Sequence, residues 1–229
     1  MTITLYELSG ADRSLRFAPH CWKSKLALVH KQLSYKTAPV WFTEKEKFAM
    51  SGQPLLPVIT DSDKVVSDSW AIAEYLEAQY PDAPSLFASE EAKEKAKAFH
   101  QWVSSTLSKH IPGIVILDLY NIIADQDKDY FRSSREERIG TSLEEFASTP
   151  EKHIQGLRAE LTHVRKLLEN QNYLGGDKPD YSDICLLGTF LWIATSGTPE
   201  FLEKDDVVYA WYQSMLSEYS SVIPESLVA

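Results

Sequence analysis

The sequence is poor in cysteine, in basic residues and in long apolar runs. Its two cysteines, Cys21 and Cys185, lie far apart and its six histidines are scattered, so we expect neither a disulfide framework nor a metal site. With 23 Lys and Arg against 33 Asp and Glu, the net charge of −10 argues against nucleic acid and anionic membranes as partners. No apolar run approaches the ~20 residues of a membrane span, and "MTITLYEL" lacks the features of a signal peptide. We therefore expect a cytoplasmic protein.

The first third of the chain alternates between extended and helical patterns. "TITLYEL" and "SYKTAPVWF" are rich in β-branched and aromatic residues, which favours strands, and apolar residues recur at helical spacing after Pro19. "TEKEKFAMSG" predicts a short helix or loop. "LLPVITD" and "KVVSD" flank a polar turn and predict a hairpin, and "DSWAIAEYLEAQYP" predicts a helix that Pro81 stops. The predicted order is β-α-β-α-β-β-α.

A proline-containing linker, "PDAPSLF", separates this part from a chain of helices. Pro112 should interrupt the first long helix, and "QDKDYFRSSREERIG" predicts a polar helix or a long loop. Helical patterns then run over 150–172, through "ICLLGTFLWIATS" and on to about Ser221, and no strand pattern follows Asp68. The sequence predicts an α/β domain (1–80), a linker (81–88) and an all-helical domain (89–229).

Pro57 interrupts what otherwise reads as a central strand, where a proline costs a ladder hydrogen bond. One interpretation is a cis bond after Leu56, which would leave the Leu56 backbone free to pair with an extended peptide ligand. The other is an ordinary proline at the entry of a strand.

Asp68 and Ser69 stand directly before the "WAIAEYL" helix. Either residue could simply cap the helix. Alternatively, the helix N-terminus and the Ser69 hydroxyl could bind a carboxylate while Asp68 binds an ammonium group. A ligand with both groups on one carbon, as in the end of an α-amino acid, would satisfy both residues.

Asp180 and Asp183 frame the start of the apolar helix in "DYSDICLLGTFLWIA". Their spacing predicts a carboxylate version of the capping box, which we interpret as structural. Cys185 follows on the same helix and is expected to be a buried small apolar residue.

In this order, and with the change from α/β to helical patterning between them, the three motifs resemble those of the cytosolic glutathione transferases over essentially the whole chain. That family joins a thioredoxin-like domain to a helical domain. Its signatures are the proline-containing strand (here "LLPVI"), the acidic-Ser pair (here "SDSWAIAEYL") and the capping box (here "DYSD"). Within the family, "APHCWKSKLAL", "WFTEKEKF" and "YFRSSREERIG" look most similar to the serine-type branch that includes the β-aryl-etherase-like transferases.

The resemblance implies a glutathione site in the first domain and a homodimer. The Leu56 backbone would pair with the cysteinyl unit beside a cis Pro57, Asp68 and Ser69 would bind the γ-glutamyl end, and Gln53 would reach the glycine end. A small hydrophobic electrophile would lie against the helical domain, near aromatic residues such as Trp102 and Tyr120.

The serine-type hydroxyl is missing, because the residue before Pro19 is Ala18. Four explanations compete. The N-terminus of the helix could stabilise the thiolate; Ser14 could donate instead, although a turn serine usually faces solvent; Cys21 could take over, although its spacing favours the core; or the protein binds glutathione without strong catalysis. The adjacent His20 is expected to be a surface residue.

We expect an enzyme that transfers glutathione to a small hydrophobic electrophile or cleaves an ether or thioether with it. The alternative is a non-catalytic protein of the same fold that binds glutathione or hydrophobic ligands, and Ala18 is the residue that supports it. A glutathione-dependent thiol reductase would need an exposed cysteine at position 18, which the chain lacks.

Overall fold

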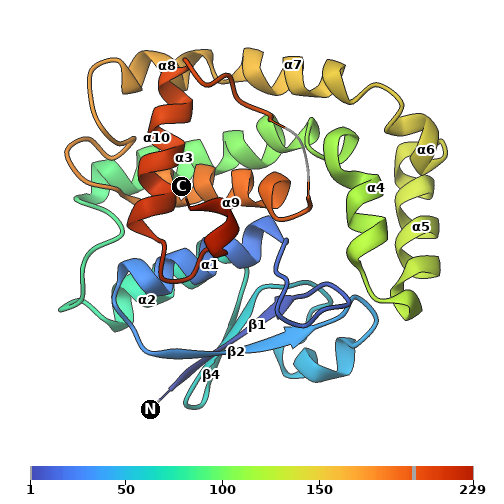
Figure 1. The fold of residues 1–229 in the computed structure, drawn as a ribbon. Helices are drawn as coiled ribbons and strands as arrows, with labels where there is room; N and C mark the ends of the chain where they lie inside the picture. The colour runs from blue at the N-terminus through green and yellow to red at the C-terminus, as the bar shows by residue number, and fades with distance from the viewer. Residues whose placement is uncertain (1, 198–199, 229) are drawn as a thin grey trace.

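The computed structural model describes residues 2–197 and 200–228, which form a mixed sheet with its helices and a larger helical part (Figure 1). The strands are β1 (Ile3–Leu8), β2 (Tyr35–Val40), β3 (Val58–Asp61) and β4 (Lys64–Ser67), in the spatial order β2-β1-β3-β4. β2 is parallel to β1, whereas β3 is antiparallel to both β1 and β4.

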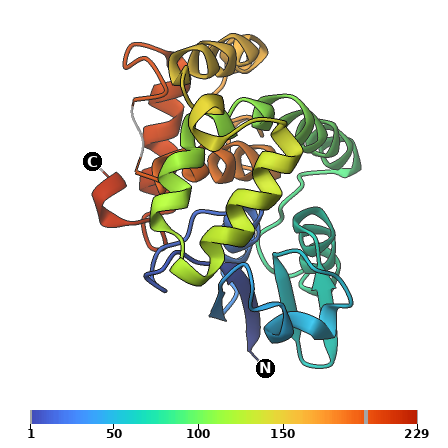
Figure 2. The same cartoon turned by 90° about the vertical axis from the view of Figure 1, so that its right-hand side faces the viewer.

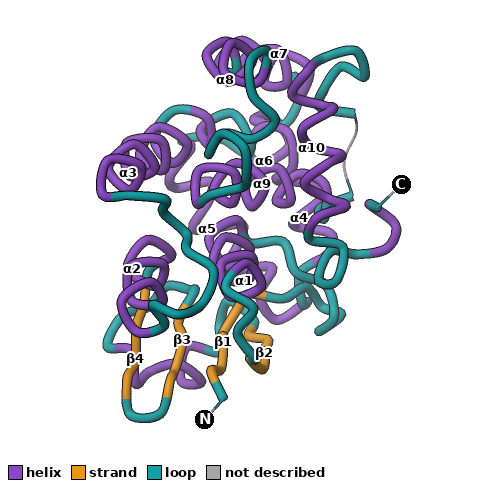
Figure 3. Tube along the Cα trace, turned by 90° about the vertical axis from the view of Figure 1, so that its left-hand side faces the viewer, coloured by secondary structure: helices purple, strands orange, loops and turns teal. Residues whose placement is uncertain are grey.

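The connections follow from the directions of the strands. A parallel pair needs a crossover, which α1 (Pro19–His30) provides between β1 and β2, and a tight turn joins the antiparallel β3 and β4. The short helix η1 (Lys45–Ser51) ends at Gly52, whose positive φ of 69° suits glycine. α2 (Ser69–Gln79) packs beside α1 over one face of the sheet (Figure 3). The predicted order β-α-β-α-β-β-α is confirmed.

The helical part begins with α3 (Glu90–Ser105), and α4 (Pro112–Ile122) follows after the one-turn helix η2 (Leu107–Lys109). Pro112 is the first residue of α4, so it interrupts the helical run as predicted. The segment left open between helix and loop is helix α5 (Asp125–Ile139), which lies beside α4 (Figure 2). The remaining elements are α6 (Leu143–Phe146), α7 (Pro150–Glu160), α8 (Thr162–Leu168), α9 (Tyr181–Ala194), α10 (Val207–Glu218) and η3 (Glu225–Leu227).

α9 lies at the centre of the core and packs closely on α1. The predicted capping box is confirmed, because the Asp183 carboxylate accepts the Asp180 N–H at 3.0 Å and Asp180 caps the first turn. The Asp183 carboxylate is fully buried and also accepts the Trp211 indole N–H at 2.8 Å. Cys185 is fully buried, as expected. None of the helices in the described ranges is long and apolar enough to cross a membrane.

Candidate active site

A cavity of about 430 Å³ lies where the start of α1 meets the helical part. Its α/β side is formed by Leu8, Phe17, Ala18, Pro19, His20, Phe42 and Leu56. The facing side comes from α3, η2, α4, α5 and α9, and it includes Ser104, Lys109, Ile116, Phe131, Arg135 and Trp192. A mainly apolar hollow of this size with a few polar groups is typical of a small-molecule site.

The N-terminal end of α1 opens onto this cavity. Ala18 is the N-cap residue, with extended φ and ψ of −70° and 123°, and its side chain makes no capping hydrogen bond. The N–H groups in the first turn of a helix have no acceptor four residues earlier, so this end carries a partial positive charge. Pro19 has no N–H, which leaves His20 and Cys21 as the first donors of the helix. The site therefore has the partially positive end of a helix at the position where the resemblance implied a hydroxyl.

The peptide bond between Leu56 and Pro57 is cis, as predicted. Leu56 precedes β3 and lines the cavity, and the Pro57 carbonyl accepts the Asp68 N–H at 3.3 Å. This bond joins the cis-proline segment to the start of α2, so two of the predicted binding motifs lie next to each other.

Asp68 caps α2 by accepting the N–H groups of Trp70 at 2.9 Å and Ala71 at 3.1 Å. Its φ of 79° is uncommon for a residue with a side chain, and such backbone conformations occur disproportionately at functional sites. Ser69 is buried, and its carbonyl accepts the Tyr181 hydroxyl at 2.7 Å. The capping interpretation is thus confirmed for Asp68, which is exposed, whereas Ser69 is buried at the start of α2.

The expectation that His20 is a surface residue is wrong. It is half-buried and lines the cavity, and its Nδ1 lies 3.2 Å from the Ser69 Oγ. Burial, with Lys23 nearby, lowers the pKa of His20 to about 3. The imidazole is therefore neutral near pH 7, and it can accept a hydrogen bond at one ring nitrogen while it donates from the other.

Cys21 lies in the core, which agrees with the interpretation drawn from its spacing. Its side chain is 1% exposed, and burial, with Glu7 nearby, raises the pKa of the thiol to about 12. A thiol with this pKa forms almost no thiolate at neutral pH, so we expect Cys21 not to act as the nucleophile.

The side chains of two predicted site residues, Ser14 and Gln53, form hydrogen bonds within their own turns. The exposed Ser14 hydroxyl donates to the Asp12 carboxylate at 2.7 Å, and Ser14 is not among the cavity-lining residues. The Gln53 side chain accepts the Leu55 N–H at 3.0 Å and also donates to the Leu55 carbonyl. The structure therefore does not bring Ser14 or Gln53 into the cavity.

Trp102 and Tyr120, expected near the electrophile, also lie outside the lining of this cavity. The Trp102 ring packs edge-on against His163, with ring centroids 4.1 Å apart, and the Tyr120 ring lies under the Arg132 guanidinium. The sequence placed them on suitable helices, but it could not show which helix face meets the cavity. Ser104 on α3 and Ile116 and Leu119 on α4 line it instead.

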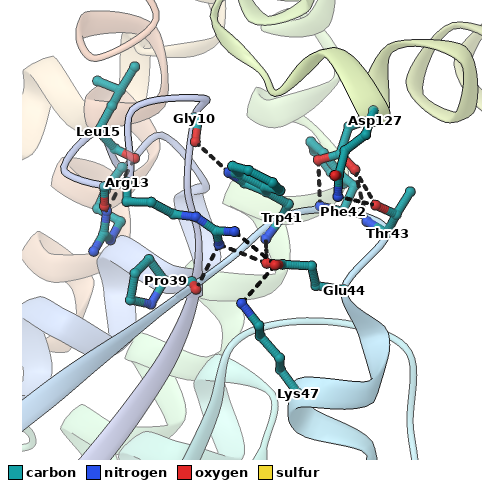
Figure 4. Close-up of polar contacts among 12 residues, drawn as sticks. Gly10, Arg13, Leu15, Pro39, Trp41, Phe42, Thr43, Glu44, Lys47 and Asp127 are labelled. Atoms are coloured by element: carbon teal, nitrogen blue, oxygen red, sulfur yellow. Dashed lines mark hydrogen bonds and ion pairs between the residues drawn. The ribbon is translucent and has the colours of Figure 1, made fainter.

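Phe42, in the loop after β2, forms one wall of the cavity, and the sequence did not predict this role. Its ring packs on Phe17 and Phe131, with centroids 6.0 and 5.7 Å away. Its N–H donates to Asp127 of α5 at 2.8 Å (Figure 4). On the other side of the loop, the Arg13 guanidinium pairs with both oxygens of Glu44.

No group of three or more His, Cys, Asp or Glu side chains suited to a metal ion is found in the part of the chain that the structure describes. The start of α1 and the cis-proline segment line one cavity, and the Asp68 cap of α2 lies next to that segment, outside the cavity lining. This arrangement is suited to binding a small peptide beside an apolar molecule.

Comparison with known proteins agrees with this arrangement. Residues 14–84 match the family model for the glutathione S-transferase N-terminal domain, and residues 96–220 match the one for the C-terminal domain. A zeta-class glutathione S-transferase of Euphorbia esula is 30% identical over 110 residues, 46% of this chain and 47% of that protein, so the match spans about half of this curated relative.

Solved structures match nearly the whole chain. The glutathione transferase GSTFuA3 of Phanerochaete chrysosporium shares 28% identity with a TM-score of 0.86, over 96% of this chain and 97% of that one. A glutathione S-transferase of Ceriporiopsis subvermispora, solved in complex with glutathione, has the same fold at 24% identity and a TM-score of 0.82, over 98% and 99% of the two chains. The chain belongs to the glutathione S-transferase family.

Proposed function

We propose that the protein is a glutathione transferase that holds the glutathione thiolate at the N-terminal end of α1. The observation that carries this proposal is that Ala18, Pro19 and His20 line the same cavity as Leu56. The similarity to a structure solved in complex with glutathione supports glutathione as the first ligand.

Glutathione would lie along the cis-proline segment as an extra extended strand. In this proposal the Leu56 backbone pairs with the cysteinyl unit, and Asp68 and Ser69 bind the γ-glutamyl ammonium and carboxylate. The His20 contact with Ser69 supports this assignment, since an imidazole N–H donated to the Ser69 Oγ would leave the hydroxyl hydrogen for the carboxylate. The Gln53 side chain would have to break its hydrogen bonds to the Leu55 backbone before it could reach the glycine end of glutathione.

The main chemical task is ionisation of the thiol. A free thiol with a pKa of about 8.5 is only a few per cent thiolate at pH 7. A helix N-terminus in a partly buried geometry can stabilise an anion by up to ~2 kcal/mol, which lowers the pKa by more than one unit. Ala18 contributes no hydroxyl. In this chain the N–H groups of the first turn of α1 would therefore stabilise the thiolate, in place of the hydroxyl that the serine-type branch uses.

The second substrate would occupy the apolar part of the cavity, between Phe42 and the helices α4 and α5. The proposed reaction is attack of the thiolate on an electrophilic carbon. This either adds glutathione to the substrate or displaces an ether or thioether oxygen or sulfur as the leaving group.

A second candidate is a protein that binds glutathione or a hydrophobic ligand without turnover. The absence of a hydroxyl at Ala18 favours it, because a helix end alone stabilises a thiolate less than a helix end with a hydroxyl does.

A titration with glutathione at neutral pH, followed by the ultraviolet absorbance of the thiolate, separates the two candidates. S-methylglutathione is the matched control, since it binds without an ionisable thiol. Saturable binding with a thiolate band supports the transferase, and binding without that band supports the non-catalytic candidate. Ala18→Ser should raise the thiolate fraction and kcat/KM by about tenfold, because it adds one charge-assisted hydrogen bond.

A further inference from the structure

The cavity beside the start of α1 is lined by cations and by no carboxylate. Lys109, Arg135 and Arg138 line it, and no Asp or Glu of the described residues does. The chain as a whole is the opposite, with 33 Asp and Glu against 23 Lys and Arg. A cleft of one sign in a protein of the other sign concentrates ligands of the complementary charge.

Two of the seven arginines form no ion pair with a carboxylate within the described ranges, and both line this cavity. Lys109 differs from Arg135 and Arg138, because its Nζ lies 3.4 Å from the Glu160 carboxylate. The other five arginines have carboxylate partners: Arg13 with Glu44, Arg16 with Glu7, Arg132 with Glu136, Arg158 with Glu203 and Arg165 with Asp206. Among the described residues, both arginines without a carboxylate partner, Arg135 and Arg138, thus line the cavity.

Arg135 is half-buried against aromatic rings. Its guanidinium carbon lies 4.5 Å from the ring centroid of Phe131 and 5.0 Å from that of Phe42, and its Nη1 donates to the Ser134 hydroxyl at 2.8 Å. Burial, with Arg138 nearby, lowers the pKa of Arg135, and the Tyr130 hydroxyl acts against that shift. A planar guanidinium held on rings presents a fork of N–H donors that matches a carboxylate.

We propose that this cavity selects an aromatic ligand that carries an acidic group, with the acid paired to Arg135 and the ring packed among Phe17, Phe42 and Phe131. The inference rests on the proposed function, since it takes the cavity as the site of the second substrate. It narrows the second substrate from any small hydrophobic electrophile to an aromatic acid. The volume of about 430 Å³ suits a ligand of one or two rings.

The test is calorimetric titration, without glutathione, with dinitrobenzoate and with dinitrobenzamide, which has nearly the same shape and no charge. We expect the wild type to bind the acid about tenfold more tightly than the amide, with a preference that shrinks as salt is added. Arg135→Gln should weaken the acid about tenfold and the amide by less than about twofold. The matched control is Arg132→Gln, one turn earlier on α5 and outside the cavity, which should change neither affinity.

Equal affinity of the wild type for acid and amide would overturn the proposal. Equal weakening of both ligands by Arg135→Gln would also overturn it, because the side chain would then act by packing alone. So would an equal loss of affinity for S-methylglutathione, because the guanidinium would then serve glutathione. Failure of the proposed function is seen separately: S-methylglutathione would not bind, whereas the preference for the acid is measured without it.

Discussion

Asp127 of α5 binds Thr43, 84 positions earlier in the chain, by accepting its hydroxyl at 2.7 Å and its N–H at 3.0 Å. The same fully buried carboxylate accepts the Phe42 N–H at 2.8 Å (Figure 4). These three bonds fix the loop after β2 to the helical part. Since Phe42 forms one wall of the cavity, these hydrogen bonds also determine the width of the cavity.

Asp127→Ala should therefore destabilise the fold and widen the cavity. It removes the acceptor of the partly buried Phe42 N–H and of the Thr43 N–H and hydroxyl, and we expect a loss of about 1–3 kcal/mol in the free energy of unfolding. Urea unfolding measures this loss, and binding of an aromatic ligand measures the effect on Phe42. Asp125→Ala on the same helix is the control, since that exposed side chain forms a surface ion pair with Lys128, and little change is expected. Equal losses for the two variants would contradict the role given to Asp127.

Cys21→Ala should leave turnover within about twofold of the wild type, because a buried thiol with a pKa of about 12 is not a nucleophile. The small cavity it leaves should cost about 1 kcal/mol of stability. Cys185→Ala, also in the core, is the matched control. Loss of turnover in a folded Cys21→Ala protein alone would show that the thiolate does not depend on the helix end.

Gly188→Ala should disturb the contact between α9 and α1. A Cβ at this position would lie 2.9 Å from Lys23 Cγ, 3.0 Å from the Lys23 backbone nitrogen and 3.2 Å from the Pro19 carbonyl oxygen. Two of these atoms are backbone and cannot rotate away, so we expect a loss of about 1–3 kcal/mol and a lower kcat/KM as the start of α1 shifts.

Gly113→Ala is the comparison for Gly188→Ala, because the three atoms nearest to its Cβ would all belong to the His153 ring, so that relief there needs movement of a side chain and not of backbone. Thermal unfolding of both variants provides the measurement. A smaller loss for Gly188→Ala than for Gly113→Ala would contradict the close backbone approach.

The parts of the site that the sequence predicted have local signals. The proline in a strand pattern offered the cis bond at Pro57 as one of two interpretations, and two carboxylates at capping-box spacing indicated the start of α9. The parts it missed depend on residues far apart in the chain: His20 meets Ser69 across 49 positions, and Asp127 meets Thr43 across 84. The spacing of apolar residues along a sequence gives no information about contacts between residues so far apart. Trp102 and Tyr120 show a second limit, since helical spacing predicts a helix but not which neighbour each face meets.

The lowered pKa values of two histidines, His20 and His100, predict how the free energy of unfolding depends on pH. Burial is the main cause that lowers the pKa of His20 to about 3 and of His100 to about 4, from 6.5. Below pH 6.5 the unfolded chain therefore binds protons at these positions that the folded protein does not, so the stability present at higher pH is lost as the pH falls. Asp183 acts in the opposite direction, because burial raises its pKa to about 6 and favours the folded state as the pH falls.

From about pH 7.5 to about pH 5.5, each of the two histidines should remove about 1.4 kcal/mol of stability, and Asp183 should return less than about 1 kcal/mol. Urea unfolding at the two pH values measures the difference. His20→Gln should reduce the loss by about 1.4 kcal/mol, because glutamine does not titrate. Ser69→Ala is the control, since it removes the partner of His20 but leaves the imidazole buried, and the loss should persist. An unchanged pH dependence in His20→Gln would mean that His20 is accessible to protons in the folded protein.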